Sequence, residues 1–280
     1  MSRLRVSRSS YYQPAVLLRD RDKQAIQDLR LAHLEHPFYG VERLAIHLDW
    51  SQHKARRIRT LAGIRIARPT KKKRYGSSVP AEILAAPNAL KQFASLRDSS
   101  RPQAGLSYAG MVDSGGWVQD FTYLWFKNCY HYLAVVMDLK TRQVVGWRLG
   151  LRHSSELTHE ALLDALSKHP SPTILHSDQG TEYLSYKHQL TCERNEITLS
   201  CSTRASPWQN GYMERFFGSF KLELGNINRH KELAQLHESV AMTLFYYNTK
   251  RIHSALKMSP AAYAATLDLR KDKVSGKVGG

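Results

Sequence analysis

The sequence predicts an α/β fold in which helices flank a mixed five-stranded sheet, preceded by a small all-α domain of the helix-turn-helix type. Two observations lead to this prediction. Strand-like and helix-like apolar segments alternate over residues 113–265, whereas the first 75 residues contain short, basic, amphipathic helical segments. With 280 residues, the chain is long enough for one core of about 140 to 150 residues and a small domain before it.

Residues 1–75 are predicted to form a basic, helix-turn-helix-like DNA-binding domain. A helical pattern runs from Arg21 to Leu34 and is ended by His36 and Pro37, and a short amphipathic segment follows from Val41 to Leu48. Ser51 is the expected N-cap of a second helix with Ala55, Ile58 and Ala62 turned inward. The exposed positions of that helix carry the candidate DNA contacts Lys54, Arg56, Arg57 and Arg59. The alternative is a solvated charged helical face.

Residues 76–112 are predicted to be a linker, because Pro, Ser, Gly and Ala dominate there. A basic run precedes it, formed by Lys71, Lys72, Lys73 and Arg74. The simplest interpretation of this run is a solvated linker, and sequence-independent phosphate contact is the alternative. The core is expected over residues 113–265, followed by a basic flexible tail over residues 266–280.

The core is predicted to begin with three antiparallel strands. Trp117 to Phe126 is rich in aromatic and β-favouring residues, as in a mostly buried strand. Two further apolar runs, within HYLAVVMDLKTRQVVGWRL, are separated by polar turn residues from Asp138 to Arg142.

Helices and short strands then alternate. A helix is expected from about Ser155 to Lys168 with Ser154 or Ser155 as its N-cap, and a short strand from Thr173 to His176. The remaining expected elements are a helix over about Glu182 to Asn195, a strand over Ile197 to Cys201, a loop over Ser202 to Gly211, a helix from about Tyr212, and one more helix ending at Pro260.

Three carboxylates fall at informative places in this scheme. Asp120 lies inside the first strand, Asp178 directly follows a short strand, and Glu214 lies in the first turn of a helix, with 57 and 35 residues between successive members. Ligands of α/β sheets bind at the carboxyl ends of strands, and helix N-termini favour acidic residues and phosphate. Hard oxygen ligands suit Mg²⁺ or Mn²⁺, and two such ions can serve an in-line phosphoryl transfer. These residues are the candidate catalytic and metal-binding groups.

Other residues near these carboxylates are candidate DNA contacts. Arg215 and Lys221 share the helix of Glu214 and are expected to point toward the same cleft. Trp208 either stacks on a displaced base or packs its loop onto the core. His176 is predicted to be a packed or hydrogen-bonded strand residue, and a supporting role for Asp178 is its alternative.

The charge distribution predicts a nucleic-acid partner. The net charge is +17, and it is uneven: residues 1–80 contribute +12, residues 81–250 only +1, and the last 30 residues +4. Because the positive charge is concentrated near the two ends and the core is near neutral, we expect most of the affinity for phosphate outside the segment that carries the three carboxylates. The three cysteines have no CxxC spacing, and neither a signal peptide nor a long apolar run is found. A soluble, intracellular protein without a disulfide or a membrane partner is expected.

Five segments resemble successive blocks of the DDE transposases encoded by two-frame bacterial insertion elements, whose core is similar to that of retroviral integrases. They are WVQDFTYLWF, YLAVVMDLKTRQVVGW, LHSDQGTEY, SPWQNGYMERFFGSFK and YYNTKRIHSALKMSPAAY, in this order from Trp117 to Tyr263. The resemblance implies a ribonuclease H-like fold and a DDE triad of Asp120, Asp178 and Glu214 that holds two Mg²⁺ ions, for which Mn²⁺ can substitute. It also implies that Asn210 and Lys221 support the substrate.

The resemblance further implies the activity and the partners. A transposase of this family would cleave element ends and transfer a 3′-hydroxyl into target DNA, as a homo-oligomer on DNA and with the upstream-frame product of the same element as a possible partner. It would act in the bacterial cytoplasm, in association with the nucleoid. The segment from Ala94 to Gly116 is longer than the family's usual spacer before the first catalytic strand.

Two other function classes remain open from the sequence. A ribonuclease H-like endonuclease would cut DNA without joining it, and a transposase-derived regulator would bind DNA without cutting it. All three candidate ligands are present, which argues against the regulator.

Overall fold

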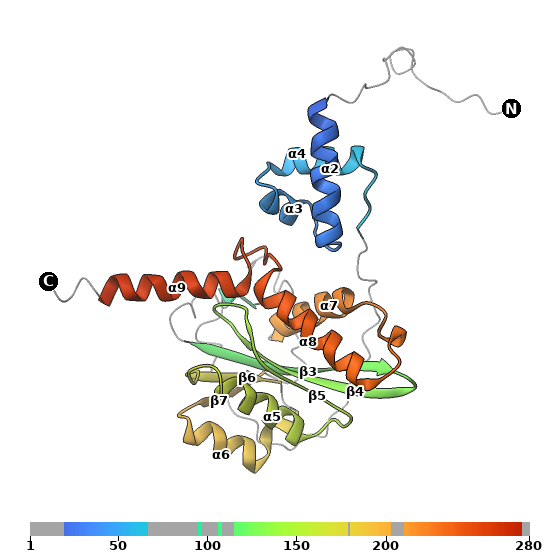
Figure 1. Cartoon of the computed structure of the whole chain (residues 1–280). Helices are drawn as coiled ribbons and strands as arrows, with labels where there is room; N and C mark the ends of the chain where they lie inside the picture. Colours follow the sequence, from blue (N-terminus) through green and yellow to red (C-terminus); the bar gives the residue numbers. More distant parts are fainter. Residues whose placement is uncertain are drawn as a thin grey trace. The chain divides into compact units, whose positions relative to one another are not determined.

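The computed structural model describes residues 20–66, 95–96, 106–107, 115–178, 180–202 and 210–275 (Figure 1). The chain divides into two compact units, Met1–Arg68 and Pro69–Gly280. None of the helices in the described ranges is long and apolar enough to cross a membrane.

The first unit is all-α. It consists of α2 (Asp20–Glu35), α3 (Val41–His47) and α4 (Gln52–Leu61). Leu29 of α2 and Ile58 of α4 are fully buried in a small shared core. The Ser51 hydroxyl accepts a hydrogen bond from the Lys54 backbone N–H at 3.2 Å, which confirms Ser51 as the N-cap of α4.

The second unit contains the predicted mixed five-stranded sheet. Its strands are β3 (Gly116–Phe126), β4 (Cys129–Asp138), β5 (Val144–Gly150), β6 (Ile174–Ser177) and β7 (Thr198–Cys201). Their spatial order is β5-β4-β3-β6-β7, with β3, β4 and β5 antiparallel and β6 and β7 parallel to β3. This topology is the predicted ribonuclease H-like one. A separate antiparallel pair, β1 (Ser95–Leu96) and β2 (Leu106–Ser107), falls within the predicted linker.

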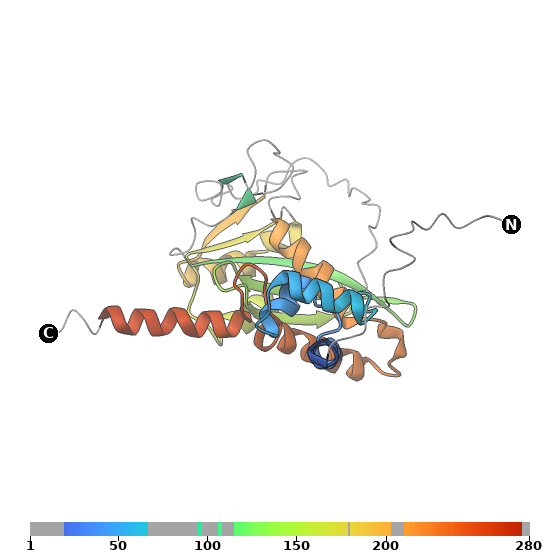
Figure 2. The ribbon, with the colours of Figure 1, turned by 90° about the horizontal axis from the view of Figure 1, so that it is seen from above.

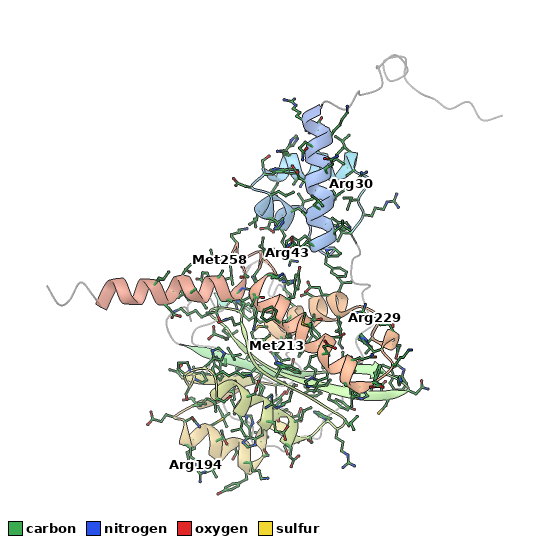
Figure 3. All side chains as sticks on the ribbon, in the orientation of Figure 1. Arg30, Arg43, Arg194, Met213, Arg229 and Met258 are labelled. Carbon is green, nitrogen blue, oxygen red and sulfur yellow. The ribbon has the colours of Figure 1, made fainter. Side chains whose placement is uncertain are left out.

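Helices cover both faces of the sheet (Figures 1 and 2). One face packs against α5 (Ser155–Leu166) and α6 (Tyr186–Arg194). The other packs against α7 (Gly211–Leu224) and α8 (Leu233–Thr249), and the fully buried Met213 of α7 contributes to this core (Figure 3). Where both faces are covered, as at residues 133–137 of β4, the strand reads as a continuous apolar run in the sequence.

The helix predicted over Glu182–Asn195 is wrong at its start. The chain first forms a 3₁₀ turn, η4 (Thr181–Leu184), and α6 begins only at Tyr186. Ser185 is extended, and its hydroxyl accepts from the His188 N–H at 3.4 Å. A serine in the N-cap conformation therefore separates the two elements.

The predicted helix end at Pro260 is also wrong, because Pro260 begins a helix. α8 ends at Thr249, and α9 spans Pro260–Ser275, through most of the segment predicted to be a flexible tail. The Ser259 hydroxyl accepts from the Ala262 N–H at 3.3 Å and acts as a cap. Proline is well suited to the first helical position, where its missing N–H is not needed.

The end of α8 and the segment that follows it are tied to the sheet and to α7, respectively. The Asn248 side chain donates to the Val144 carbonyl at 2.8 Å and accepts from the Val144 N–H at 2.9 Å. Arg251 and Glu223 are both buried, and the Arg251 Nε donates to the Glu223 Oε1 at 2.6 Å. These contacts hold the last part of the core in place.

Candidate active site

Asp120 and Asp178 lie side by side because of the register between two parallel strands. The last residue pair between β3 and β6 is Val118 with His176, and each aspartate follows its strand's member of this pair by two residues. Asp178 comes directly after the end of β6, while β3 continues along β4. Both carboxylates are thus presented at the point where the β6 edge ends, the usual position for a site in an α/β sheet.

Burial and neighbouring carboxylate charges raise the pKa of both aspartates. The pKa of Asp120 lies well above its ordinary value, first because of burial and then because of the charge of Asp178, with smaller contributions from Glu182 and Glu214. Burial also raises the pKa of Asp178. One N–H stabilises each charged form: Phe121 N–H donates to Asp120 at 2.8 Å, and Gly180 N–H donates to Asp178 at 3.0 Å. Like charges gathered in this way favour the binding of a cation.

Glu214 enters the site from α7. It is exposed in the first turn of this helix, and its charge contributes to the raised pKa of Asp120. The residue before the helix, Asn210, is buried, and its side-chain Nδ2 donates to the Asp120 Oδ2 at 3.3 Å. Asn210 therefore links the start of α7 to β3.

The carboxylates are grouped without forming a tight cage. Within the described ranges, three potential ligand atoms lie within 4.8 Å of one another at Glu35, His36 and His47, in the first unit. Among the described residues, the ligand atoms of Asp120, Asp178 and Glu214 do not form a cluster this tight. These side chains would have to move closer together to bind a metal ion. An all-oxygen donor set of this kind suits Mg²⁺, which usually keeps several waters and uses few protein carboxylates.

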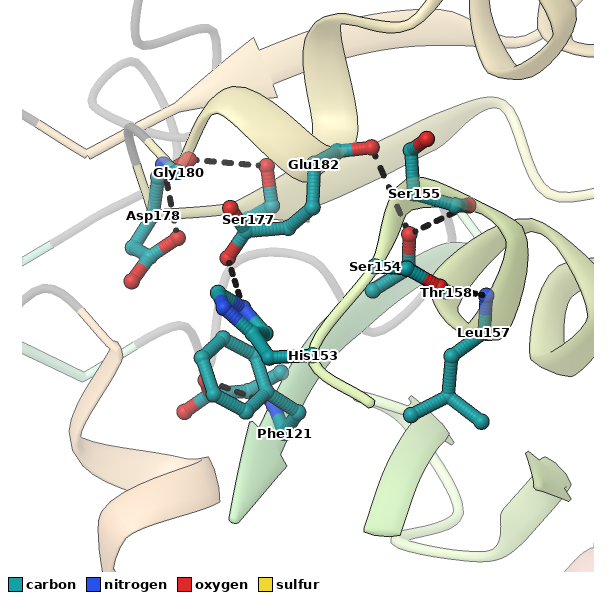
Figure 4. A network of polar contacts seen from close by, with 11 residues as sticks. Phe121, His153, Ser154, Ser155, Leu157, Thr158, Ser177, Asp178, Gly180 and Glu182 are labelled. Atoms are coloured by element: carbon teal, nitrogen blue, oxygen red, sulfur yellow. Dashed lines mark hydrogen bonds and ion pairs between the residues drawn. The ribbon is translucent and has the colours of Figure 1, made fainter. Parts of the chain in front are cut away.

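A fourth acidic side chain, Glu182, borders the two aspartates, and the sequence analysis did not single it out. It is buried, and its Oε1 lies 3.0 Å from the His153 Nε2 (Figure 4). The His153 ring lies 4.0 Å from the ring of Phe121, the residue that follows Asp120. The charge of Glu182 raises the pKa of both Asp120 and Asp178. The sequence could have indicated Glu182 only through its position four residues after Asp178, because its partner His153 is 29 residues away along the chain.

Gly180 makes room for the Glu182 carboxylate. A Cβ atom at this glycine would collide with the carboxylate, with 2.7 Å to its Oε2. The Gly180 φ of −64° is open to any residue, so a larger residue here would act by displacing the Glu182 carboxylate from its place beside Asp178.

His176 is buried and hydrogen-bonded through both ring nitrogens. Its Nδ1 lies 2.9 Å from the Ser200 hydroxyl, and its Nε2 lies 3.0 Å from the Ser202 hydroxyl. Burial lowers the pKa of His176 to about 4, so the ring is neutral at physiological pH. This geometry matches the predicted packed, hydrogen-bonded role of His176. The two hydrogen bonds fix the end of β6 just before Asp178.

The candidate DNA contacts on the core differ in their surroundings. The Lys221 Nζ lies 4.5 Å from the centre of the Tyr123 ring on β3, and Arg215 is exposed beside Glu214. Asn210 contacts Asp120 as described above. Trp208 lies outside the described residues.

The candidate DNA contacts on the first unit also differ from one another. Lys54 and Arg56 are exposed, Arg59 is half-buried, and the Lys54 Nζ lies 4.1 Å from the centre of the Trp50 ring. Arg57 makes two hydrogen bonds to Asp22 on α2, at 2.8 and 3.0 Å. The basic run Lys71, Lys72, Lys73 and Arg74 lies outside the described residues.

Comparison with protein families connects this site to known proteins. An integrase core domain family matches residues 114–207, and a second family of the same description matches residues 195–260. Together they cover more than half of the chain and span all three carboxylates. The chain belongs to the integrase core family, among the transposases of insertion sequences.

Curated relatives from bacteria match different lengths of this integrase core protein. It is 36% identical over 143 residues to the transposase for insertion sequence element IS904 of Lactococcus lactis, a match that covers 50% of this chain and 56% of that protein. A 31 kDa protein of insertion element IS600 from Shigella sonnei is 28% identical over 276 residues, covering 92% of this chain and 94% of that protein. The putative transposase InsK of IS150 from Escherichia coli K12 is 28% identical over 269 residues, covering 92% and 89%.

Solved structures of retroviral integrases are also similar. The HTLV-2 integrase catalytic core domain in complex with magnesium has a TM-score of 0.46 and 21% identity, and the match covers 54% of this chain and 95% of that one. The simian T-cell lymphotropic virus intasome has a TM-score of 0.48 and 17% identity, covering 83% and 72%.

Proposed function

We propose that this chain is a DNA transposase that cleaves the ends of its insertion element and joins the freed 3′-hydroxyl to target DNA. The observation that carries the proposal is the meeting of Asp120, inside β3, with Asp178, which directly follows the parallel strand β6. Glu214 lies in the first turn of α7, and Asn210, just before that helix, hydrogen-bonds to Asp120. Membership of the integrase core family supports the same conclusion.

Asp120, Asp178 and Glu214 would hold divalent cations, Mg²⁺ or Mn²⁺. The donor set fits, because three carboxylates converge and the aspartates have raised pKa values that a cation would lower. When bound, two such ions stabilise the attacking and leaving oxygens of an in-line displacement.

The chain's own residues would bind and orient the DNA. Asn210 holds Asp120 in position through its amide, and its Oδ1 is buried without a hydrogen-bond partner in the described part of the structure. The first turn of α7 favours a phosphate near Glu214, because helix N-termini carry partial positive charge. Arg215 and Lys221, on the same helix, would contact the DNA backbone.

The proposal extends to partners. Element ends and target DNA are the proposed substrates, a homo-oligomer assembled on DNA is the proposed working form, and the upstream-frame product of the same element is a possible further partner. The protein would act with the nucleoid in the bacterial cytoplasm. The basic helix α4 of the first unit supports DNA binding outside the chemical centre.

A strand-transfer assay tests the proposal. Pre-cut element ends with free 3′-hydroxyls are mixed with a plasmid target and Mg²⁺ or Mn²⁺, and joined products are measured for the wild type, Glu214→Gln and Glu193→Gln. Glu193 is a matched control, since it is an exposed glutamate on α6. Joining by the wild type and Glu193→Gln, with none by Glu214→Gln, is the expected result.

The other outcomes select the rival functions. Metal-dependent cutting by the wild type without joining would assign an endonuclease. DNA binding without either reaction, in the presence of the upstream-frame product as well as without it, would assign a regulator.

A further inference from the structure

Three large aromatic side chains are exposed together on the β3–β4 hairpin. They are Tyr123 and Trp125 of β3 and Tyr130 of β4, with 55%, 48% and 47% of their surfaces exposed. The Tyr130 ring centre lies 4.6 Å from that of Trp125 and 5.5 Å from that of Tyr123. We call these three residues the aromatic strip.

The strip results from the strand register. Side chains two residues apart on a strand point to the same face, and Tyr130 is the direct partner of Trp125 across the antiparallel pair. On the opposite face, Leu124 and Phe126 are almost completely buried in the core formed with α7 and α8. The hairpin is therefore packed on one face and exposes aromatic rings on the other.

Further aromatic rings lie between the strip and the carboxylates. Tyr132 is the partner of Tyr123 on β4, and its ring centre lies 5.7 Å from that of His153. His153 in turn contacts Phe121 and the Glu182 carboxylate. Aromatic rings thus extend from the neighbourhood of Asp120 and Asp178 toward the tip of the hairpin.

Two features favour a nucleic-acid strand as the occupant of this surface. The Lys221 ammonium lies over the Tyr123 ring, so positive charge borders the aromatic face. Tyr123 lies three residues after Asp120 on the same strand, about 10 Å along it, so its side chain points to the other face of β3, and Lys221 of α7 reaches its ring from the side of Glu214. Alternating aromatic faces and cations are the features that bind single-stranded nucleic acid without sequence preference.

Among the described residues, β3 has no strand partner on its β6 side beyond Val118. The described pairing with β6 ends at Val118, while pairing with β4 continues to Phe126. From Tyr123 to Trp125 the strand advances about 7 Å, enough for roughly two or three bases stacked at about 3.4 Å.

We infer that the aromatic strip binds unpaired nucleotides of the DNA strand that leads into the active site, by stacking bases on Tyr123, Trp125 and Tyr130. This inference rests on the proposed function for the choice of DNA as the ligand. It assigns the hairpin a role in holding strand ends apart from their complement near the carboxylates.

Binding to a 12-nucleotide oligo(dT) and to a 12-base-pair duplex tests the inference. Fluorescence anisotropy with labelled DNA is measured on the full chain in EDTA, so that metal chemistry does not contribute. The double variant Tyr123→Ala/Trp125→Ala is expected to bind the single strand about 10- to 100-fold more weakly, because each lost base stack costs affinity. Its affinity for the duplex should stay within about twofold of wild type.

Control variants separate stacking from general effects. Tyr186→Ala and Phe245→Ala remove exposed aromatics on α6 and α8 and should leave both affinities unchanged. Trp125→Phe keeps an aromatic face and should retain most of the single-strand affinity. Thermal unfolding of each variant verifies that it is folded.

Two results would overturn the inference. Unchanged single-strand affinity in a folded double variant would remove the strip from DNA binding. Loss of self-association in sedimentation velocity, with unchanged DNA affinity, would assign the strip to a contact with a second copy of the chain. The proposed function is tested separately, because Glu214→Gln should still bind oligo(dT) even though it does not join DNA.

Discussion

Two acidic sites on the core use their carboxylates in opposite ways. Glu223, near the end of α7, is buried against the equally buried Arg251, so a cation of the chain compensates its charge. Asp120, beside the start of the same helix, has a pKa that is raised first by burial and then by the charges of other carboxylates, those of Asp178, Glu182 and Glu214. The paired carboxylate stabilises the fold, whereas the clustered carboxylates cost stability and are suited to receive an external cation.

The largest effect should come from neutralising the clustered site. Asp120→Asn should reduce strand joining by about 10³-fold or more, because it removes charge where the transition state requires metal-mediated stabilisation. The raised pKa shows that the folded state disfavours the ionised Asp120, so at neutral pH the metal-free variant should be at least as stable as wild type. Strand-transfer rates and chemical denaturation in EDTA measure the two quantities.

The metal response provides the control for this variant. Added Mn²⁺ should raise the melting temperature of the wild type and raise that of Asp120→Asn less. A variant that is clearly less stable than wild type in EDTA would show that Asp120 has a structural partner, and the contrast with Glu223 would fail.

The paired site should show the reverse behaviour. Arg251→Ala should lower the free energy of unfolding by roughly 3 to 5 kcal/mol, because it leaves the buried Glu223 carboxylate without its cation. Urea denaturation measures this loss. Glu223→Gln/Arg251→Met removes both charges together and should recover much of it. If the single variant lost less than about 1 kcal/mol, the ion pair would not be a main support of the segment between α8 and α9.

The neutral side chain of His176, close to Asp178 in the sequence, can be compared with the paired Glu223 and the clustered Asp120. The pKa of His176 is lowered to about 4 by burial, so as pH falls below about 6.5 the unfolded chain takes up a proton that the folded chain does not. The contribution of His176 to stability is present above pH 6.5 and is lost as pH falls toward 4, by roughly 3 kcal/mol.

Denaturation between pH 7 and pH 4 measures this effect. His176→Gln should show a correspondingly smaller fall in stability over the same range, since glutamine does not titrate. Parallel curves for the two proteins would mean that His176 is protonated in the folded state, or that other groups dominate.

The sequence predicted those features that depend on neighbouring residues. The aromatic pattern around Asp120 indicated β3, the polar turn after Asp138 indicated the β4–β5 connection, and Ser51 was identified as a cap. The sequence also placed Asp178 after a strand and Glu214 in a first helical turn, and the structure has both there.

Features that depend on distant residues were not predictable. The ion pair of Glu223 with Arg251 and the contact of Glu182 with His153 join residues 28 and 29 positions apart, and no local pattern marks either pair. Pro260 was interpreted as a helix end because proline disrupts helix interiors, although the same residue also suits a first turn. The sequence identified the chemical groups, and packing determined which of them are paired.

The smallest effects are expected on α4, where the same comparison separates two adjacent arginines. Both arginines are exposed, and Arg57 is held by two hydrogen bonds to the buried Asp22. Arg56→Ala should weaken DNA binding a few-fold and lower the slope of log affinity against log salt by about 1, with little change in melting temperature. Arg57→Ala should instead lower the melting temperature, because it removes two hydrogen bonds to the buried Asp22 carboxylate. Salt titrations of DNA affinity together with thermal unfolding distinguish the two variants. The contrary result would be that Arg57→Ala changes the salt slope as much as Arg56→Ala does, without loss of stability. That result would show that a charge paired within the fold also binds DNA. The separation between charges that stabilise the fold and charges that bind an external ligand, seen for Glu223 and Asp120, would then not hold in the first unit.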